Sequence, residues 1–382
     1  MPLIPNSLLC YCPASIGGIA QYCHEQSKAL SSLGISVTTL CPSDYPYQEE
    51  GYSQIRRLTP KGTKRESRLV NQAEIAYGLL EDARVLDKII SAKKFNRVLF
   101  ASYSEYLAPL WAWRLRRQQA SGVKFAAVVH DPVRNYIIGP EWWHNRSVRE
   151  GYSFLDQVYL HEPVSLEFEP SGRDLKKSVI PHGPFPAIPA KLSKSVAREK
   201  YSLPPEATVL ISFGYIRDNK NLNLAIESLA SLPNCHLLVA GRESTDCQRP
   251  VSFYRDLAAS RGVGKQCHWI NRFIEPAEIG DLFIASDYAL LTYSRAFRSA
   301  SGVLSTAVSY RIPCVASGGQ SSLKSSILEY KLGTWVEADN LGALIEGVNA
   351  SISNPPSPQW DRYFDEHSWR TNARIIIETF LN

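Results

Sequence analysis

The 382-residue sequence lacks the long apolar and basic segments that mark several protein classes. No apolar run reaches the ~18 residues of a membrane-spanning helix, and no signal peptide is expected at its start. The net charge is only +5, without the dense basic run of a nucleic-acid-binding module. This balance argues against a nucleic-acid partner, but it suits an anionic ligand or an acidic membrane surface.

Catalytic and metal-binding signatures are also missing. The sequence has no Asp-x-Asp, His-Glu-x-x-His, Gly-x-Ser-x-Gly or Gly-x-x-x-x-Gly-Lys-[Ser/Thr] motif. Their absence argues against single-domain metal-dependent sugar transferases, zinc proteases, α/β-hydrolases and P-loop NTPases. The eight cysteines form no zinc-type cluster, and several, such as Cys10, Cys12 and Cys314, lie in apolar runs. We therefore expect buried, reduced thiols in a cytoplasmic protein.

The sequence does contain a regular alternation of apolar runs and helix patterns. The runs that predict strands are SLLCYCP, VTTLCP, RVLFASY, KFAAVVHD, QVYLHE, KSVIPHG, TVLISFG, CHLLVAGR, CHWINRFI, YALLTYS, IPCVAS and TWVEA. A proline-rich linker at 181–195 divides them into units of 1–185 and 195–360. The predicted fold class is α/β, with two mostly parallel sheets and a ligand cleft between their carboxyl ends.

Two predicted strand-to-helix turns have features that suit a phosphate. Gly17 and Gly18 follow the first strand, and glycines at a helix N-terminus let the backbone approach an anion. Arg217 and Lys220 follow Gly214 and suit a diphosphate through charge-assisted hydrogen bonds. The alternatives are a tight turn without a ligand and two solvated surface cations.

The stretch SASGVLSTAVSYR offers a third phosphate site. Ser301 and Gly302 precede or begin a helix pattern that continues through Val303. Small residues at a helix start leave backbone N–H groups exposed, and such groups bind phosphate oxygens. The alternative is an ordinary buried helix capped by serines.

Other polar side chains follow predicted strands at the same sheet edges. Arg242, Arg272 and Phe273 are candidate contacts to a nucleoside, although such loops are often merely polar. His130 and Asp131 end the strand KFAAVVHD, which directs the histidine toward a cleft. A structural hydrogen-bonding role for His130 is the alternative.

Taken in order, these segments resemble the family-4 glycosyltransferases of the GT-B fold. The resemblance covers nearly the whole chain, and its most specific segments are GGIAQYCHEQSKALSSLG, VVHDP, VIPHGPF, SFGYIRDNKN, LLVAGRE, RFIEPAEIGDLFIASDYALLTYS, SGVLSTAVSYRIPCVAS and FDEHSWRTNA. The Ser-Gly-Val-Leu form of the last phosphate loop resembles bacterial polysaccharide-type members. It implies two Rossmann-like domains, with a terminal helix at 365–382 that rejoins the first.

The resemblance also implies an activity, the retaining, metal-independent transfer of a sugar, of hexosyl type, from a nucleotide diphosphate donor. It implies no cofactor beyond that donor and a glycan or lipid-linked acceptor. By position His130, Arg217 and Lys220 would be catalytic. The residues that would bind the diphosphate are Gly17, Gly18, Arg217, Lys220, Ser301, Gly302 and Val303, and those that would meet the nucleoside are Arg242, Arg272 and Phe273.

One departure from the family pattern leaves an alternative open. Many members carry two glutamates, eight positions apart, where this chain has Arg298 and Thr306. The first glutamate usually holds hydroxyls of the donor sugar. The chain is therefore either an active transferase that grips the sugar differently or an inactive nucleotide-sugar-binding partner subunit. Another GT-B enzyme, such as a sugar-nucleotide epimerase, is a further alternative, and a periplasmic-type sugar-binding protein fits poorly.

The acceptor side has two candidate features. Trp142 and Trp143 lie in a predicted loop after His130, where their rings either stack on an acceptor sugar or fill a gap. The segment 111–125 mixes tryptophans with arginines, which suits peripheral contact with anionic lipid at the inner face of the membrane. An amphipathic helix with a solvated face explains that segment equally well.

Overall fold

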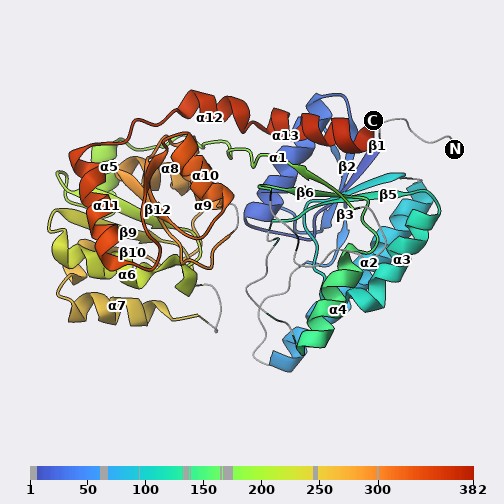
Figure 1. The fold of residues 1–382 in the computed structure, drawn as a ribbon, viewed down its shortest axis with the longest axis horizontal. Helices are drawn as coiled ribbons and strands as arrows, with labels where there is room; N and C mark the ends of the chain where they lie inside the picture. Colours follow the sequence, from blue (N-terminus) through green and yellow to red (C-terminus); the bar gives the residue numbers. More distant parts are fainter. Residues whose placement is uncertain are drawn as a thin grey trace. The chain divides into compact units, whose positions relative to one another are not determined.

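A computed structural model describes residues 7–60, 68–93, 95–130, 132, 137, 139–163, 166, 175–243, 248–298 and 301–382, without the side chains of 68–72 and 93. The chain forms two compact units (Figure 1). Unit 1 comprises Met1–His182 and His367–Asn382, and unit 2 comprises Gly183–Glu366. The last sixteen residues thus return to the unit that contains the first strand.

Unit 1 is built on a seven-stranded parallel sheet of order β3-β2-β1-β4-β5-β6-β7. Its strands are β1 (Ser7–Tyr11), β2 (Ser36–Pro42), β3 (Ser53–Leu58), β4 (Arg97–Phe100), β5 (Lys124–Val128), β6 (Gln157–Leu160) and β7 (Lys176–Val179). Strands β1 and β6 are buried at every position, as apolar runs in a sheet covered on both faces should be.

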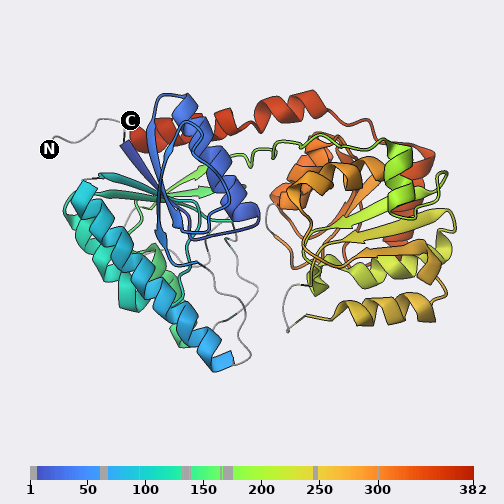
Figure 2. The ribbon, with the colours of Figure 1, turned by 180° about the vertical axis from the view of Figure 1, so that it is seen from behind.

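Helices cover both faces of this sheet (Figures 1 and 2). They are α1 (Gly18–Ser32), α2 (Arg68–Lys93), α3 (Ala108–Ala120), α4 (Glu141–Tyr152) and α13 (Trp369–Ile376), which continues as a π-helix at Ile377–Leu381. Helices α2, α3 and α4 pack side by side over a core that includes Leu86, Trp111 and Phe154. Helix α1 packs against α13, so the C-terminal segment completes the other layer.

Unit 2 contains a six-stranded parallel sheet of order β10-β9-β8-β11-β12-β13. Its strands are β8 (Thr208–Phe213), β9 (Cys235–Ala240), β10 (Cys267–Ile270), β11 (Tyr288–Thr292), β12 (Cys314–Ser317) and β13 (Gly333–Trp335). Strand order changes direction at β8, and the carboxyl ends of parallel strands at such a point form the usual ligand position.

Two apolar clusters fill the two faces of the unit 2 sheet. One lies under α5 (Lys194–Lys200), α8 (Pro276–Ala285), α9 (Gly302–Ser309), α10 (Ser322–Glu329) and α12 (Trp360–Glu366). The other lies under α6 (Leu222–Ser228), α7 (Val251–Ser260) and α11 (Leu341–Ser353). Three short 3₁₀ turns, Asp218–Lys220, Leu229–Ser231 and Gly264–Gln266, complete the unit.

The two parallel-sheet, Rossmann-like domains confirm the predicted fold class. Every apolar run predicted as a strand contains or overlaps one. The sequence missed β3, because its SQIRRL pattern is mostly exposed at the sheet edge and gives no apolar run. Among the described residues the seven cysteines are buried and free, as predicted, while Cys247 lies outside the description.

The proline-rich linker is held along the surface of unit 2. Backbone N–H groups of Lys191 and Leu192 donate to Asp281 at 2.8 and 3.1 Å. The Phe185 N–H donates to Ser305 Oγ at 2.8 Å, and Ile188 exchanges two hydrogen bonds with the Tyr310 hydroxyl. Side chains of α8, of α9 and of the residue that follows α9 thus replace the regular backbone pairing that this segment lacks.

Candidate active site

The carboxyl end of β8 brings together three features of the predicted phosphate site. Gly214 directly follows the strand with φ +85°. A Cβ at that position would lie 3.4 Å from Lys220 Nζ and 3.7 Å from Val303 Cγ2. The glycine turn, the lysine and the start of helix α9 therefore meet at one point.

Lys220 is held in place by its own turn. Its Nζ donates a hydrogen bond of 2.6 Å to the Phe213 carbonyl, and its carbonyl accepts one of 2.8 Å from Thr292 Oγ1. Burial, assisted by repulsion from Arg217, lowers the pKa of Lys220 to about 7. Burial and Arg217 disfavour the charged form of this lysine, so an anion that binds beside it would stabilise that form.

Arg217 and Arg242 flank one aromatic ring. Each guanidinium carbon lies 5.5 Å from the centre of the Tyr215 ring, and Arg242 Nη2 donates to the Tyr215 hydroxyl at 3.2 Å. Both arginines are exposed. Tyr215, which the sequence analysis did not single out, therefore organises two predicted donor contacts through cation–π attraction.

Close packing of the backbone at Gly241 holds the Gly214 turn in place. Gly241 follows β9, and a Cβ there would lie 2.1 Å from the Gly214 carbonyl oxygen. The Gly241 N–H donates to the Ile270 carbonyl at 3.0 Å, and the Gly214 N–H donates to Ala240 at 2.9 Å. No side chain fits at Gly241 without moving the Gly214 turn.

Ser301 caps helix α9 rather than pointing freely outward. Its Oγ accepts from the Leu304 N–H at 3.2 Å and lies 2.9 Å from the Tyr293 hydroxyl. Burial raises the pKa of Tyr293 to about 12, partly offset by Arg217, so the phenol stays neutral. Because the Ser301 side chain is occupied, the helix start offers an anion the backbone N–H groups of Gly302 and Val303.

The two predicted nucleoside contacts after β10 differ in their surroundings. Arg272 makes a two-pronged ion pair with Glu278, at 2.7 Å for both contacts. That pairing, chiefly its hydrogen bonds, lowers the pKa of Glu278 and directs the guanidinium along helix α8. Phe273 is 42% exposed, so its ring is available for stacking.

In unit 1 the first glycine turn is open. Gly17 adopts φ +82° as the N-cap of α1, and a Cβ on Gly17 or Gly18 would meet no atom within 4 Å. One turn further along α1, Tyr22 is fully buried. Its ring packs nearly perpendicular to that of His130, with centroids 4.8 Å apart, so α1 packs against the residues that follow β5.

His130 lies within a histidine cluster that sequence reasoning did not anticipate. His130 Nδ1 is 3.2 Å from His161 Nε2, and the His161 and His182 ring centroids are 5.3 Å apart. Trp369 of α13 packs against both Tyr22 and His182. The signal was present in QVYLHE and KSVIPHG, where a histidine follows each apolar run as it does in KFAAVVHD. Asp131 lies outside the described residues.

Comparisons with known proteins identify the family. The family model for "Glycosyltransferase Family 4" matches residues 16–158, and that for "Glycosyl transferases group 1" matches residues 193–373. Each model thus covers most of one unit. The chain is a family-4-like GT-B glycosyltransferase. No curated protein sequence matches it significantly.

Solved structures of glycosyltransferases share the fold over nearly the entire chain. Anabaena HepE in complex with UDP and glucose gives a TM-score of 0.70 at 14% identity, covering 98% of both chains. Sucrose-phosphate synthase from Thermosynechococcus elongatus gives 0.67 at 15%, covering 99% of this chain and 95% of its own. WaaG, a glycosyltransferase involved in lipopolysaccharide biosynthesis, gives 0.61 at 15%, with coverage of 98% and 95%.

The glycosyltransferase carries its tryptophan pair on a helix, not in the predicted loop. Trp142 and Trp143 occupy the first turn of α4, which begins after the N-cap Pro140 with the acidic Glu141. An extended proline and a carboxylate at this position favour a helix start. Trp142 is 65% exposed, whereas Trp143 is partly buried and packs beside Gly139.

The two positions that differ from the family pattern carry no carboxylate at the site. Arg298 is exposed and directly precedes two residues outside the described set. Thr306 Oγ1 donates to the Gly302 carbonyl at 3.1 Å within α9. Neighbouring Arg295 is paired with Glu337 at 3.0 Å.

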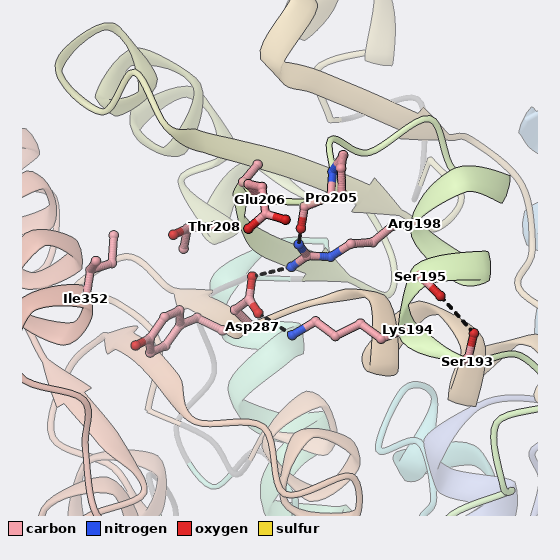
Figure 3. Close-up of a pocket in the computed structure, with 11 residues that line it drawn as sticks. Ser193, Lys194, Ser195, Arg198, Pro205, Glu206, Thr208, Asp287 and Ile352 are labelled. Carbon is pink, nitrogen blue, oxygen red and sulfur yellow. Dashed lines mark hydrogen bonds and ion pairs between the residues drawn. The ribbon is translucent and has the colours of Figure 1, made fainter.

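A cavity of about 790 Å³ in unit 2 lies at the opposite edge of the sheet. It adjoins Thr208, the first residue of β8, and Asp287, which precedes β11. Figure 3 shows Lys194 and Arg198 reaching toward Asp287, at 2.6 and 2.7 Å. Both cations are paired with Asp287 and the carboxylate of Glu206 also lines the cavity, so the lining carries no excess positive charge for a diphosphate.

Metal-binding clusters and membrane-spanning helices are both absent from the residues that the structure describes. No group of three or more histidine, cysteine, aspartate or glutamate side chains there is arranged to hold a metal ion. None of the described helices has the length and hydropathy needed to span a bilayer.

Proposed function

We propose that this glycosyltransferase is a retaining hexosyltransferase that moves a sugar from a nucleotide diphosphate donor to a glycan or lipid-linked acceptor. It does so without a catalytic metal or other cofactor, in polysaccharide or glycolipid synthesis. The meeting of Lys220, Gly214 and Val303 carries the proposal. It combines a cation, a glycine turn and a helix start at one strand end, a combination that suits a diphosphate.

In this proposal Arg217 and Lys220 stabilise the leaving diphosphate. Negative charge grows on it as its bond to the anomeric carbon breaks, and fixed cations aimed at that charge lower the barrier. Gly17 and Gly18 supply backbone contacts from unit 1, and His130 contacts the donor sugar. Arg242, Arg272 and Phe273 meet the nucleoside, with Arg272 first leaving Glu278 or acting together with it.

Two of the similar proteins suggest which substrates to try. HepE binds UDP and UDP-glucose, which makes UDP-glucose the first donor to test. WaaG acts in lipopolysaccharide biosynthesis, which favours a lipid-linked glycan as acceptor. Such an acceptor fits the exposed Trp142 and the predicted location in the cytoplasm at the inner face of the membrane.

The first experiment is calorimetric and thermal-shift titration of the whole chain with UDP, GDP, ADP and their sugars, with and without a chelator. Selective binding of one diphosphate, unaffected by the chelator, supports the proposal and names the donor class. If no nucleotide gives binding heat or changes the Tm, the carboxyl end of β8 is not a phosphate site. Product analysis with that donor and a lipid-linked oligosaccharide, including the anomeric configuration, then tests transfer and retention.

The exposed Arg298 and the internally bonded Thr306 favour a second candidate, a nucleotide-sugar-binding partner subunit without catalysis. Donor hydrolysis by the purified chain separates the two. Slow release of the free sugar identifies a transferase, whereas tight donor binding with no turnover under any acceptor condition identifies a binding subunit.

A further inference from the structure

A line of hydrogen bonds runs along the carboxyl edge of the unit 1 sheet. His130 Nε2 lies 3.0 Å from the Ala101 carbonyl oxygen, and His130 Nδ1 lies 3.2 Å from His161 Nε2. His161 Nδ1 lies 3.1 Å from the Ile180 carbonyl oxygen. The four residues follow β4, β5, β6 and β7, which are consecutive neighbours in the sheet.

Both ends of this line are carbonyl oxygens, which can only accept. His130 must therefore carry a proton on Nε2, and His161 must carry one on Nδ1. The contact between the two rings needs a third proton. Two neutral imidazoles together hold two N–H protons, so three hydrogen bonds are made only when the pair carries one positive charge.

A second histidine pair in unit 2 provides a contrast. His236 Nδ1 lies 2.9 Å from His268 Nε2, and His268 also bonds the Tyr201 backbone. These two bonds need two protons, which two neutral rings supply. Burial lowers the pKa of both histidines, in agreement with a neutral pair.

The groups around the first pair determine which ring holds the charge. Burial, with repulsion from His130 and His182, lowers the pKa of His161 well below its usual range, so His161 is the neutral partner. Burial raises the pKa of Tyr22, and that phenol accepts from Asn372 and Gln26. The ring of Trp369 closes the cluster beside His182.

Glu162 directly follows His161 in the chain, so it brings a carboxyl group next to the cluster. Burial raises its pKa to about 7, so it adds little fixed negative charge below neutral pH. The two hydrogen bonds that its N–H groups donate favour the charge on His130.

We propose that His161 is a positioning residue that holds His130 as an imidazolium, with its two N–H groups aimed at His161 and the Ala101 carbonyl. His130 then acts as a fixed cation at the sheet edge and not as a general base, because it has no free lone pair. The role in transfer depends on the proposed function, whereas the charge state is a property of the free protein.

The test is ¹⁵N NMR of the whole chain labelled in histidine, recorded near neutral pH. An imidazolium shows two similar ring-nitrogen signals, whereas a neutral ring shows one protonated and one bare nitrogen. We expect the imidazolium pattern at His130 and the neutral pattern at His161, His236 and His268. A neutral His130 would overturn the proposal, since one of the three hydrogen bonds would then be absent.

Two substitutions separate positioning from simple packing. His161→Gln keeps a neutral acceptor for His130 and a donor for Ile180, so His130 should keep its imidazolium signals. His161→Leu removes the acceptor, and the pH at which His130 titrates should fall by about one to two units, the scale of a hydrogen bond to a charged group. Equal titration of His130 in both variants would contradict the proposal. His236→Gln is the control and should leave His130 unchanged.

Once a donor is known, the same variants give a kinetic test. kcat should fall more in His161→Leu than in His161→Gln, and its loss in the leucine variant should increase as pH rises through the new titration point of His130. Absence of any transfer would defeat the proposed function while leaving the NMR result to decide the charge state. If the two variants have equal kcat values although His130 titrates at different pH values in them, His161 has no role in the reaction.

Discussion

The Lys220 ammonium donates a hydrogen bond of 2.6 Å to the Phe213 carbonyl, at the end of the strand that leads into Gly214. Burial and Arg217 lower its pKa to about 7. In the free protein this lysine is therefore partly neutral at neutral pH, and a bound diphosphate would stabilise its charged form.

Lys220 should make donor binding depend on protons. Because the anion raises the lysine pKa again, UDP binding above about pH 7 takes up a proton, and affinity falls as pH rises. Calorimetry in two buffers of different ionisation enthalpy measures this uptake. Lys220→Met should abolish it and weaken binding by ~1.5–3 kcal/mol, whereas Arg242→Met should weaken binding but retain the uptake. Unchanged uptake in Lys220→Met would place the titrating group elsewhere.

Gly241→Ala should damage the donor site through the backbone. The new Cβ would lie 2.1 Å from the Gly214 carbonyl oxygen, so the turn beside Lys220 has to move, at a cost of ~1–3 kcal/mol in stability. We expect a lower Tm and a clear loss of UDP affinity. Gly262→Ala is the matched control, since Gly262 also has positive φ but open space around it, and it should lower Tm alone. Equal UDP affinity in both variants would argue against this corner as the donor site.

His130→Ala should lower turnover more than donor affinity, because His130 is proposed to contact the donor sugar at the reacting centre. Steady-state kinetics combined with UDP-sugar titration gives the two quantities separately. Losses of the same size in both would make His130 a donor-binding residue only.

Trp142 and Trp143 should behave differently although they are adjacent. Trp142 is 65% exposed, so Trp142→Ala should change the free energy of unfolding by less than ~0.5 kcal/mol while raising the KM for a glycan acceptor. Trp143 is partly buried, and Trp143→Ala should lower Tm. An unchanged acceptor KM in Trp142→Ala would leave that ring without a role in acceptor binding.

Asn372 should be important for the stability of unit 1. Its fully buried amide donates to Tyr22 Oη at 2.9 Å and to the Pro181 carbonyl at 2.8 Å, and it accepts from Gln26 at 3.0 Å. Asn372→Leu leaves these groups buried without that partner and should cost ~2–3 kcal/mol, measured by urea unfolding. Asn354→Leu, at the exposed end of α11, should cost less than ~0.5 kcal/mol. Similar losses in the two variants would show that the amide network contributes little.

The strands, the first glycine turn and helix α9 were predictable because their signals are local. An apolar run such as TVLISF is recognisable without its neighbours, and Gly17, Gly214 and Ser301 lie at turns that adjacent residues define. Strand β3 was not predicted from the sequence, because most of its side chains are exposed or partly exposed and form no apolar run. The loop predicted at Trp142 and Trp143 is helix α4, which starts after Pro140 without a side-chain cap and so gives only a weak local signal.

Contacts between side chains from distant segments were decided only in the folded chain. Lys220 and Val303 meet at Gly214 because β8 pairs in the sheet with β11, the strand that precedes helix α9. Likewise, His130 and His161 are 31 positions apart, and they pair only because β5 and β6 align with their carboxyl ends together. Local pattern predicts which residues end a strand, but strand order and register determine which of those ends lie side by side, and both depend on burying the whole sheet at once.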